Sequence, residues 1–172
     1  VTNEVQEFIT RMEGKADFNL VEIGGTVGDL EGGVFLEAAR EFAATVGWER
    51  CLFMHLTYAP YLRVVGETKT KPTQHSLRQL MSYGIYANVV VIRSEVELPE
   101  KERIKVARLC GRPLERIISC PDSDTIYRVP LTLHKHGLDT AVLQHFGLKA
   151  KEPVLDKWQD ICGIMTQPPR TV

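Results

Sequence analysis

Residues 89–120, VVVIRSEVELPEKERIKVARLCGRPLERIISC, decide the fold class of this chain. The three valines and the isoleucine of residues 89–92 predict a strand that is buried on both faces. A helix is predicted over residues 99–110 and is closed by Gly111. Residues 116–120 predict a second strand. Because a strand, a helix and a further strand follow one another, the segment is typical of a parallel sheet covered by helices.

The same alternation extends toward the N-terminus. Apolar spacing predicts helices over residues 3–13, 35–46 and 74–83 and strands over residues 18–23 and 51–56. The predicted fold is therefore α/β, with a largely parallel sheet flanked by helices. Ligands of such sheets bind beyond the carboxyl ends of the strands, so functional residues are expected directly after strands.

Composition narrows the function classes. The chain has 172 residues, which is typical of one domain of about 100–200 residues. It carries 21 Lys plus Arg and 22 Asp plus Glu, so the formal net charge is 21 − 22 = −1. This balance argues against a nucleic-acid or membrane-surface partner. No run approaches the ~20 apolar residues of a membrane helix. The four cysteines form no C-x-x-C pair, and we expect reduced thiols and a cytoplasmic location.

A first loop motif follows the predicted strand at residues 18–23. Residues 21–31, VEIGGTVGDLE, combine three glycines with the carboxylates of Glu22, Asp29 and Glu31. Glycines allow close approach of a ligand, and a carboxylate at a strand end can hold Mg²⁺ beside nucleotide phosphates. The alternative is an ordinary turn followed by a helix N-cap.

A second loop motif is basic. Residues 66–76, GETKTKPTQHS, place Lys69 and Lys71 on either side of a threonine, just before a predicted helix. Two ammonium groups and the backbone donors of a helix start can bind a polyphosphate. The alternative is a solvated basic loop.

Two further groups follow the strands of residues 89–120. Arg93 ends the first strand, and Lys101, Arg103 and Lys105 lie on the next helix, where a run of charges is usually a solvated face. Asp122 and Ser123 follow the second strand. They are good turn residues, and they could also hydrogen-bond a base edge.

Other catalytic motifs are absent from the sequence. It contains no G-x-S-x-G, no H-E-x-x-H and no G-x-x-x-x-G-K-[ST] phosphate loop. His55 lies in a predicted strand, and we interpret it as a core histidine. No catalytic residue is assigned.

Several strings together resemble one family. They are residues 22–31 (EIGGTVGDLE), residues 55–57 (HLT), residues 66–76 (GETKTKPTQHS), Arg93-Ser94 and Ile126-Tyr127. These strings resemble the synthetase (amidoligase) domain of CTP synthase. The resemblance implies a P-loop NTPase or dethiobiotin-synthetase-like amidoligase fold that is incomplete at the N-terminus. It implies that residues 1–165 are the C-terminal part of that domain. Residues 166–172 would begin a linker toward a glutaminase domain.

The resemblance also implies an activity. The family is an ATP-dependent C–N ligase that phosphorylates the 4-oxygen of UTP with Mg²⁺ and ATP. Ammonia derived from glutamine then displaces phosphate and gives CTP, in pyrimidine nucleotide biosynthesis. Implied partners are UTP, ATP, CTP as product and feedback inhibitor, GTP as allosteric effector, and further copies in a homotetramer. The chain is expected to be inactive alone.

Site residues carry over position by position. The resemblance implies that Glu22 is a Mg²⁺ ligand. It implies UTP and CTP contacts by Asp29, Glu31, Lys69, Gln74 and Lys105, and ATP contacts by Arg93, Asp122 and Ser123. Two other readings remain open: a non-catalytic module that binds UTP and CTP or serves assembly, and a dethiobiotin-synthetase-like enzyme. The KTKPTQ string speaks against the latter.

Overall fold

A three-stranded parallel sheet forms the centre of the molecule. The computed structural model describes residues 1–149 and 151–166. Its sheet contains β1 (Met54–Tyr58), β4 (Val89–Ser94) and β5 (Ile117–Pro121) in the order β1-β4-β5. Both pairings are parallel, with Leu56 opposite Val91 and Val91 opposite Ile118. The predicted α/β class with a parallel sheet is confirmed. The predicted linker beyond Thr166 lies outside the described residues.

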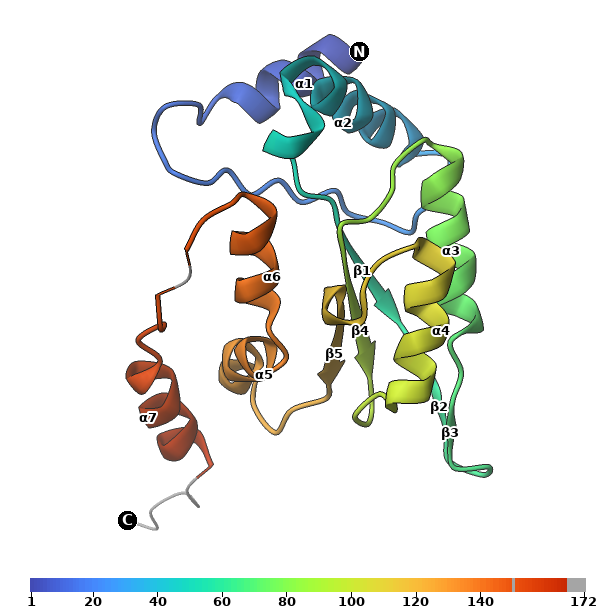
Figure 1. Cartoon of the computed structure of the whole chain (residues 1–172), viewed down its shortest axis with the longest axis vertical. Coiled ribbons are helices and arrows are strands. Elements are labelled where there is room, and N and C mark those ends of the chain that lie inside the picture. Colours follow the sequence, from blue (N-terminus) through green and yellow to red (C-terminus); the bar gives the residue numbers. More distant parts are fainter. Residues whose placement is uncertain (150, 167–172) are drawn as a thin grey trace.

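Helices cover the sheet on both faces (Figure 1). One face packs against α3 (Lys71–Ser82) and α4 (Glu100–Cys110), and the other against α5 (Val129–Lys135) and α6 (Leu138–His145). Residues 89–92 of β4 are all buried, as predicted for a strand covered on both faces. The remaining elements are α1 (Thr2–Thr10), α2 (Gly33–Val46), the short helices Trp48–Arg50, Leu114–Arg116 and Ile126–Arg128, the hairpin strands β2 (Tyr61–Leu62) and β3 (Glu67–Thr68), and α7 (Asp156–Met165).

Residues 18–23 correct the predicted strand arrangement. They form no strand, and Leu20 is 93% exposed, so the prediction of a buried strand was wrong. An apolar run becomes a strand only when another strand accepts its backbone hydrogen bonds, and none of the described strands pairs with these residues. Ile23 alone among residues 18–23 packs against the core.

Smaller shifts occur at several element boundaries, and helix α1, predicted over residues 3–13, ends at Thr10. Strand β1 begins at Met54, three residues after the predicted start. Helix α3 begins at Lys71, three residues before the predicted start, with Pro72 in its first turn. Proline is well suited to that position because its missing N–H would have no helical partner there. Lys71 is therefore a helix residue and not a loop residue.

Strand β1 is an edge of the sheet, and it is unevenly covered. His55 points to the buried side and is buried, whereas Met54, Leu56 and Tyr58 are exposed. The same alternation places Leu56 beside Val91, which helices α5 and α6 help to cover. The cover on that face therefore stops one strand short of the sheet edge.

All four cysteines are free, and burial raises the pKa of the Cys51, Cys110 and Cys120 thiols. Among the described residues, no helix is both long and apolar enough to cross a membrane.

Candidate functional site

Three chain segments meet beyond the carboxyl ends of the strands. The Ala59 amide donates to the Arg93 carbonyl, and the Asp122 amide donates to the Ser94 carbonyl, both at 2.8 Å. These bonds continue the sheet past β1, β4 and β5. The residues that follow the three strands therefore share one edge, which is where α/β sheets bind ligands.

The hairpin β2–β3 delivers the basic motif to this edge. Gly66 makes the turn with a φ of 65°, a backbone conformation that favours glycine. The Lys69 amide then donates to the Pro60 carbonyl at 2.9 Å. Thr70 follows as the buried N-cap residue of α3. Backbone contacts therefore hold the motif in place at Lys69 and Thr70.

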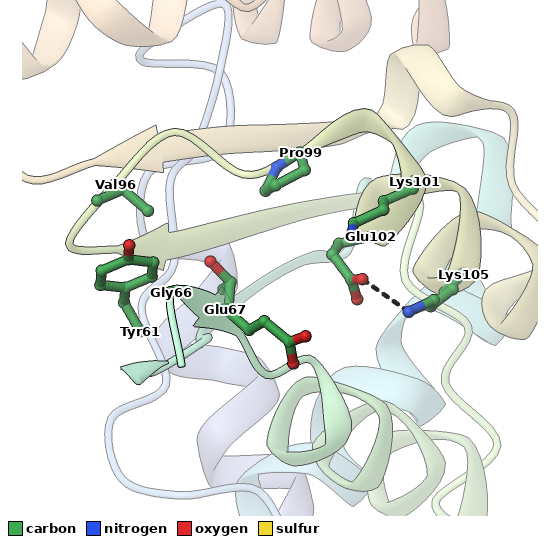
Figure 2. A pocket seen from close by; sticks show the side chains of 9 residues that line it. Tyr61, Gly66, Glu67, Val96, Pro99, Lys101, Glu102 and Lys105 are labelled. Carbon is green, nitrogen blue, oxygen red and sulfur yellow. Dashed lines mark hydrogen bonds and ion pairs between the residues drawn. The ribbon is translucent and has the colours of Figure 1, made fainter. Parts of the chain in front are cut away.

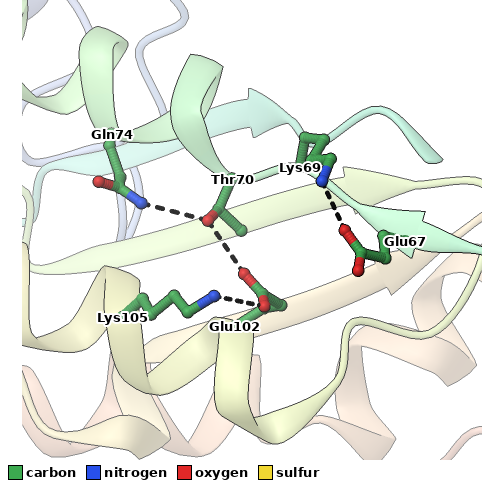
Figure 3. A network of polar contacts seen from close by, with 6 residues as sticks. All are labelled: Glu67, Lys69, Thr70, Gln74, Glu102 and Lys105. Carbon is green, nitrogen blue, oxygen red and sulfur yellow. Dashed lines mark hydrogen bonds and ion pairs between the residues drawn. The ribbon is translucent and has the colours of Figure 1, made fainter. Parts of the chain in front are cut away.

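Polar side chains from α3 and α4 converge on Thr70 (Figure 3). Gln74 Nε2 donates to Thr70 Oγ1 at 3.2 Å, and Thr70 Oγ1 donates to Glu102 Oε2 at 3.2 Å. Lys105 Nζ donates to Glu102 Oε1 at 2.6 Å. Lys69 Nζ lies 2.5 Å from Glu67 Oε2, and this contact lowers the pKa of Glu67. We call these six residues the Thr70 network.

The Thr70 network contains three residues that the sequence singled out, in two bonded parts: Gln74 and Lys105 belong to one, and Lys69 pairs with Glu67 in the other. Lys69, Gln74 and Lys105 come from separate elements, and Thr70 and Glu102 link Gln74 to Lys105. Sequence reasoning missed Glu67, Thr70 and Glu102 as site residues. The spacing of Glu102 and Lys105, three residues apart on one helix, is the signal that could have indicated their pairing.

A cavity of about 190 Å³ lies beside the Thr70 network. Figure 2 shows Glu102 and Lys105 at one end and Tyr61 and Val96 at the other. Thr68 also lines it, and its buried hydroxyl has no hydrogen-bond partner. The remaining lining residues are Gly66, Glu67, Pro99 and Lys101. The cavity is polar at one end and apolar at the other.

Arg93 and Asp122 form a second group. Arg93 Nε lies 3.1 Å from Asp122 Oδ1, and both side chains remain largely open to solvent. Ser123 follows Asp122 and is half-buried. The structure thus brings together the three residues for which the resemblance implies ATP contacts.

The acidic motif lies apart from both groups. Glu22, Asp29 and Glu31 are exposed on the segment before α2. A hypothetical Cβ on Gly28 would lie 3.4 Å from Gln79 Cδ, so this segment runs against α3. Within residues 1–149 and 151–166, no hydrogen bond or ion pair joins the three carboxylates to the Thr70 network. The same residues contain no cluster of three or more His, Cys, Asp or Glu that could hold a metal ion.

The remaining candidates have structural partners. His55 is buried, and its Nε2 lies 2.8 Å from Ser76 Oγ, so the interpretation as a core histidine is confirmed. Burial lowers the pKa of His55. Arg103 donates to the carbonyls of Leu114 and Ile117, which fixes α4 to the start of β5. Of the charged residues on α4, Arg103 therefore has a packing role, whereas Lys101 and Lys105 line the cavity.

An α/β sheet with cationic and amide side chains gathered at its carboxyl edge is the architecture of a ligand-binding α/β protein. A family model described as CTP synthase N-terminus matches residues 1–148. The chain belongs to this CTP synthase N-terminal family.

Relatives named CTP synthase support the assignment. The chain is 50% identical to that of Cereibacter sphaeroides (strain ATCC 17029 / ATH 2.4.9) over 162 residues, which is 94% of this chain and 30% of the relative. It is 46% identical to that of Azospirillum brasilense over 169 residues, or 98% of this chain and 31% of the relative. For Desulfotalea psychrophila (strain LSv54 / DSM 12343) the identity is 40% over 172 residues, or 100% and 31%. The chain thus spans about a third of the length of these relatives.

Proposed function

We propose that this chain serves as part of a CTP synthase, an ATP-dependent ligase that converts UTP to CTP with ammonia from glutamine. The observation that carries the proposal is the link from Gln74 to Lys105 through Thr70 and Glu102, with the Lys69–Glu67 pair at the same cavity. The side chains of Lys69, Gln74 and Lys105 offer hydrogen-bond donors to one anionic ligand. Family membership supports the choice of that ligand as a pyrimidine nucleoside triphosphate.

The Thr70 network would bind the triphosphate of UTP, and of CTP as feedback inhibitor. Lys105 gives one donor to Glu102 and keeps two for phosphate oxygens. The amide of Gln74 gives one N–H to Thr70 and keeps the other. Each charge-assisted hydrogen bond to phosphate contributes about 1.5–3 kcal/mol. Asp29 and Glu31 lie apart from this network, so in the tetramer they would contact the pyrimidine nucleoside at the site of a neighbouring subunit.

ATP would bind at the second group. Arg93 and Asp122 would lie against the adenine, with Ser123 beside them. The 4-oxygen of UTP would attack the γ-phosphoryl group of ATP, and ADP would leave. Ammonia would then add to carbon 4 and lose a proton. The bond between carbon 4 and the phosphorylated oxygen would break, and phosphate would leave. The described residues would position the two nucleotides for these reaction steps.

Magnesium would be held mainly by the nucleotides. Glu22 offers one exposed carboxylate, and among the described residues it belongs to no group of three or more His, Cys, Asp or Glu that could hold a metal ion. Mg²⁺ is commonly bound by one or two carboxylates together with substrate phosphates and water. Glu22 therefore fits as a single protein ligand, and the ion, when bound, would neutralise phosphate charge.

The remaining assignments complete the proposal. Residues 1–165 would be the C-terminal part of the synthetase domain, and residues 166–172 would lead toward a glutaminase domain. The complete enzyme would be a cytoplasmic homotetramer, with GTP as its allosteric effector. It would have neither a nucleic-acid nor a membrane partner.

Replacing Lys69 by alanine in the complete enzyme tests the nucleotide site. Loss of one charge-assisted contact should weaken the binding of UTP and of CTP by roughly 10- to 150-fold, because both nucleotides carry the same triphosphate. The ATP response should change much less. UTP titrations with ammonium chloride as nitrogen donor, followed by CTP inhibition curves, measure these effects.

Lys71→Ala is the matched control, because Lys71 is exposed and lies outside the Thr70 network. Its effect should be smaller. An unchanged UTP response in Lys69→Ala, or a loss confined to ATP, would contradict the proposed site.

A further inference from the structure

We propose that Glu102 is a positioning residue of the triphosphate site, holding Lys105 directly and Gln74 through Thr70. This inference rests on the proposed function, because it assigns a task to a residue behind the groups that would touch the ligand. The juxtaposition that carries it joins α3 to α4 across 32 positions of sequence between Thr70 and Glu102.

Glu102 is almost fully buried, with only 7% of its surface exposed. Burying a carboxylate is costly unless hydrogen bonds and an opposite charge offset the lost hydration. Both of its oxygens are engaged: Oε1 accepts from Lys105 and Oε2 accepts from Thr70. A carboxylate engaged at both oxygens fixes the direction of both donors.

Helix capping does not account for this position. Glu102 lies in the first turn of α4, where an acidic residue stabilises the helix dipole. Glu100 in the same turn is exposed and provides that interaction without the cost of burial. The burial of Glu102 therefore calls for a role that involves its partners.

Thr70 shows how the position of Glu102 reaches Gln74. Thr70 is the N-cap residue of α3, yet its side chain accepts no capping hydrogen bond from a backbone N–H of that helix. Its single hydroxyl proton goes to Glu102, so its oxygen is left to accept from the Gln74 amide. The amide nitrogen of Gln74 is thereby turned toward Thr70, with one N–H left for a ligand.

The experiment compares Thr70→Val with Thr70→Ser in the complete enzyme. Valine keeps the shape of threonine and removes the hydroxyl, whereas serine keeps the hydroxyl and removes the methyl group. If Thr70 relays the position of Glu102, valine should raise the KM for UTP about tenfold and serine should restore most of the loss. At metal sites, removing a partner that orients a ligand-binding side chain typically lowers metal affinity or activity by about 10- to 100-fold.

Glu102→Gln tests the carboxylate itself, with Glu100→Gln as the matched control in the same helical turn. Glutamine at position 102 loses the charge that pairs with Lys105. We expect a similar rise in the KM for UTP, with kcat and the KM for ATP changed less than about twofold. Thermal unfolding of each variant checks the fold, and the Thr70 pair decides the question if Glu102→Gln does not fold.

The outcomes separate this inference from the proposed function. If Lys69→Ala and Lys105→Met leave the KM for UTP unchanged, the proposed site is wrong, and the inference is wrong as well. If both lysine variants weaken UTP while Thr70→Val and Glu102→Gln do not, only the inference is overturned. Tighter UTP binding in Glu102→Gln, or an equal loss in Thr70→Ser and Thr70→Val, also overturns it.

Discussion

The two lysines of the Thr70 network are restrained to different degrees. Lys69 pairs with Glu67, and both side chains are about half exposed. Exposed ion pairs contribute about 0–1 kcal/mol, so an incoming phosphate can displace Glu67 at little cost. Lys105 pairs with a carboxylate that is only 10% exposed and held on its other side by Thr70. Lys69 can therefore move to meet a ligand, whereas Lys105 is held in place before the ligand arrives.

Arg93 offers a residue-scale prediction on the ATP side of the proposed site. An arginine that packs over an aromatic base contributes about 0.5–2 kcal/mol, so Arg93→Ala should weaken ATP roughly 2- to 30-fold. The UTP response should stay near that of the unsubstituted enzyme. ATP and UTP titrations with ammonia as donor measure both responses.

Arg63→Ala is the control for Arg93→Ala, because Arg63 is also an exposed arginine in an ion pair, with Glu95. This substitution should leave the affinity for ATP unchanged. Equal effects of the two substitutions would assign the loss to general charge and not to an adenine contact.

His55 predicts a dependence of stability on pH. Burial lowers the pKa of His55 below its ordinary value of 6.5. The unfolded chain therefore takes up the proton first as the pH falls. The contribution of His55 to the free energy of unfolding is fully present above about pH 6.5 and is lost as the pH falls toward the folded-state pKa.

Urea unfolding of the chain at about pH 7.5 and about pH 5 measures this effect. In His55→Gln, which cannot titrate, the drop in the free energy of unfolding should be smaller than in the unsubstituted chain. His75→Gln is the control, because His75 is exposed on α3 beside Ser76. A drop of equal size in the unsubstituted chain and in His55→Gln would contradict the assignment.

At the scale of elements, β4 lies at the centre of the core. It pairs with both other strands of the sheet and contributes buried side chains to both faces. Ile92 is fully buried on the face covered by α3 and α4. Ile92→Ala should lower the free energy of unfolding by about 2–5 kcal/mol, because it leaves a cavity in the core.

Ile126→Ala provides the matched control, since Ile126 is 77% exposed. The change there should stay within about 0.5 kcal/mol. Urea midpoints of both variants decide the matter, and similar losses would contradict the place of β4 at the centre of the core.

The elements that sequence reasoning predicted are those whose signals are local. Residues 89–92 form an unbroken apolar run, and Gly111 adopts the left-handed conformation that ends α4. Residues 18–23 are also apolar, but their state depends on whether a strand lies beside them, which their own sequence does not encode. The hairpin β2–β3 is too short to give a periodic signal.

The same distinction between local signals and distant partners applies to the site residues. Lys69, Gln74 and Lys105 were assigned to UTP and CTP through a family resemblance. The structure joins Gln74 to Lys105 through Thr70 and Glu102, whereas Lys69 pairs with Glu67. Glu102 escaped notice because a glutamate among Lys101, Arg103 and Lys105 resembles a solvated helix face. Its burial follows from the packing of α4 against the residues before α3, which lie far away in the sequence.

For the molecule as a whole, the chain of residues 1–172 is expected to form no CTP by itself. Phosphoryl transfer depends on positioning and on charge stabilisation around the ATP phosphates, and the sequence contains no G-x-x-x-x-G-K-[ST] loop. The assay contains the purified chain, UTP, ATP, Mg²⁺ and ammonium chloride, with the complete enzyme as positive control. CTP formation above a protein-free blank would contradict this expectation.

We expect the open edge of β1 to determine how the purified chain behaves at high concentration. Its outer backbone groups pair with no described strand, and the apolar side chains of Met54, Leu56 and Tyr58 stand beside them. Open apolar edges are templates on which another copy can add a strand, and repeated addition leads to precipitates. A lysine at position 56 would place a charge on that edge and keep concentrated solutions clear. Light scattering against concentration, for the chain with and without Leu56→Lys, would register the difference.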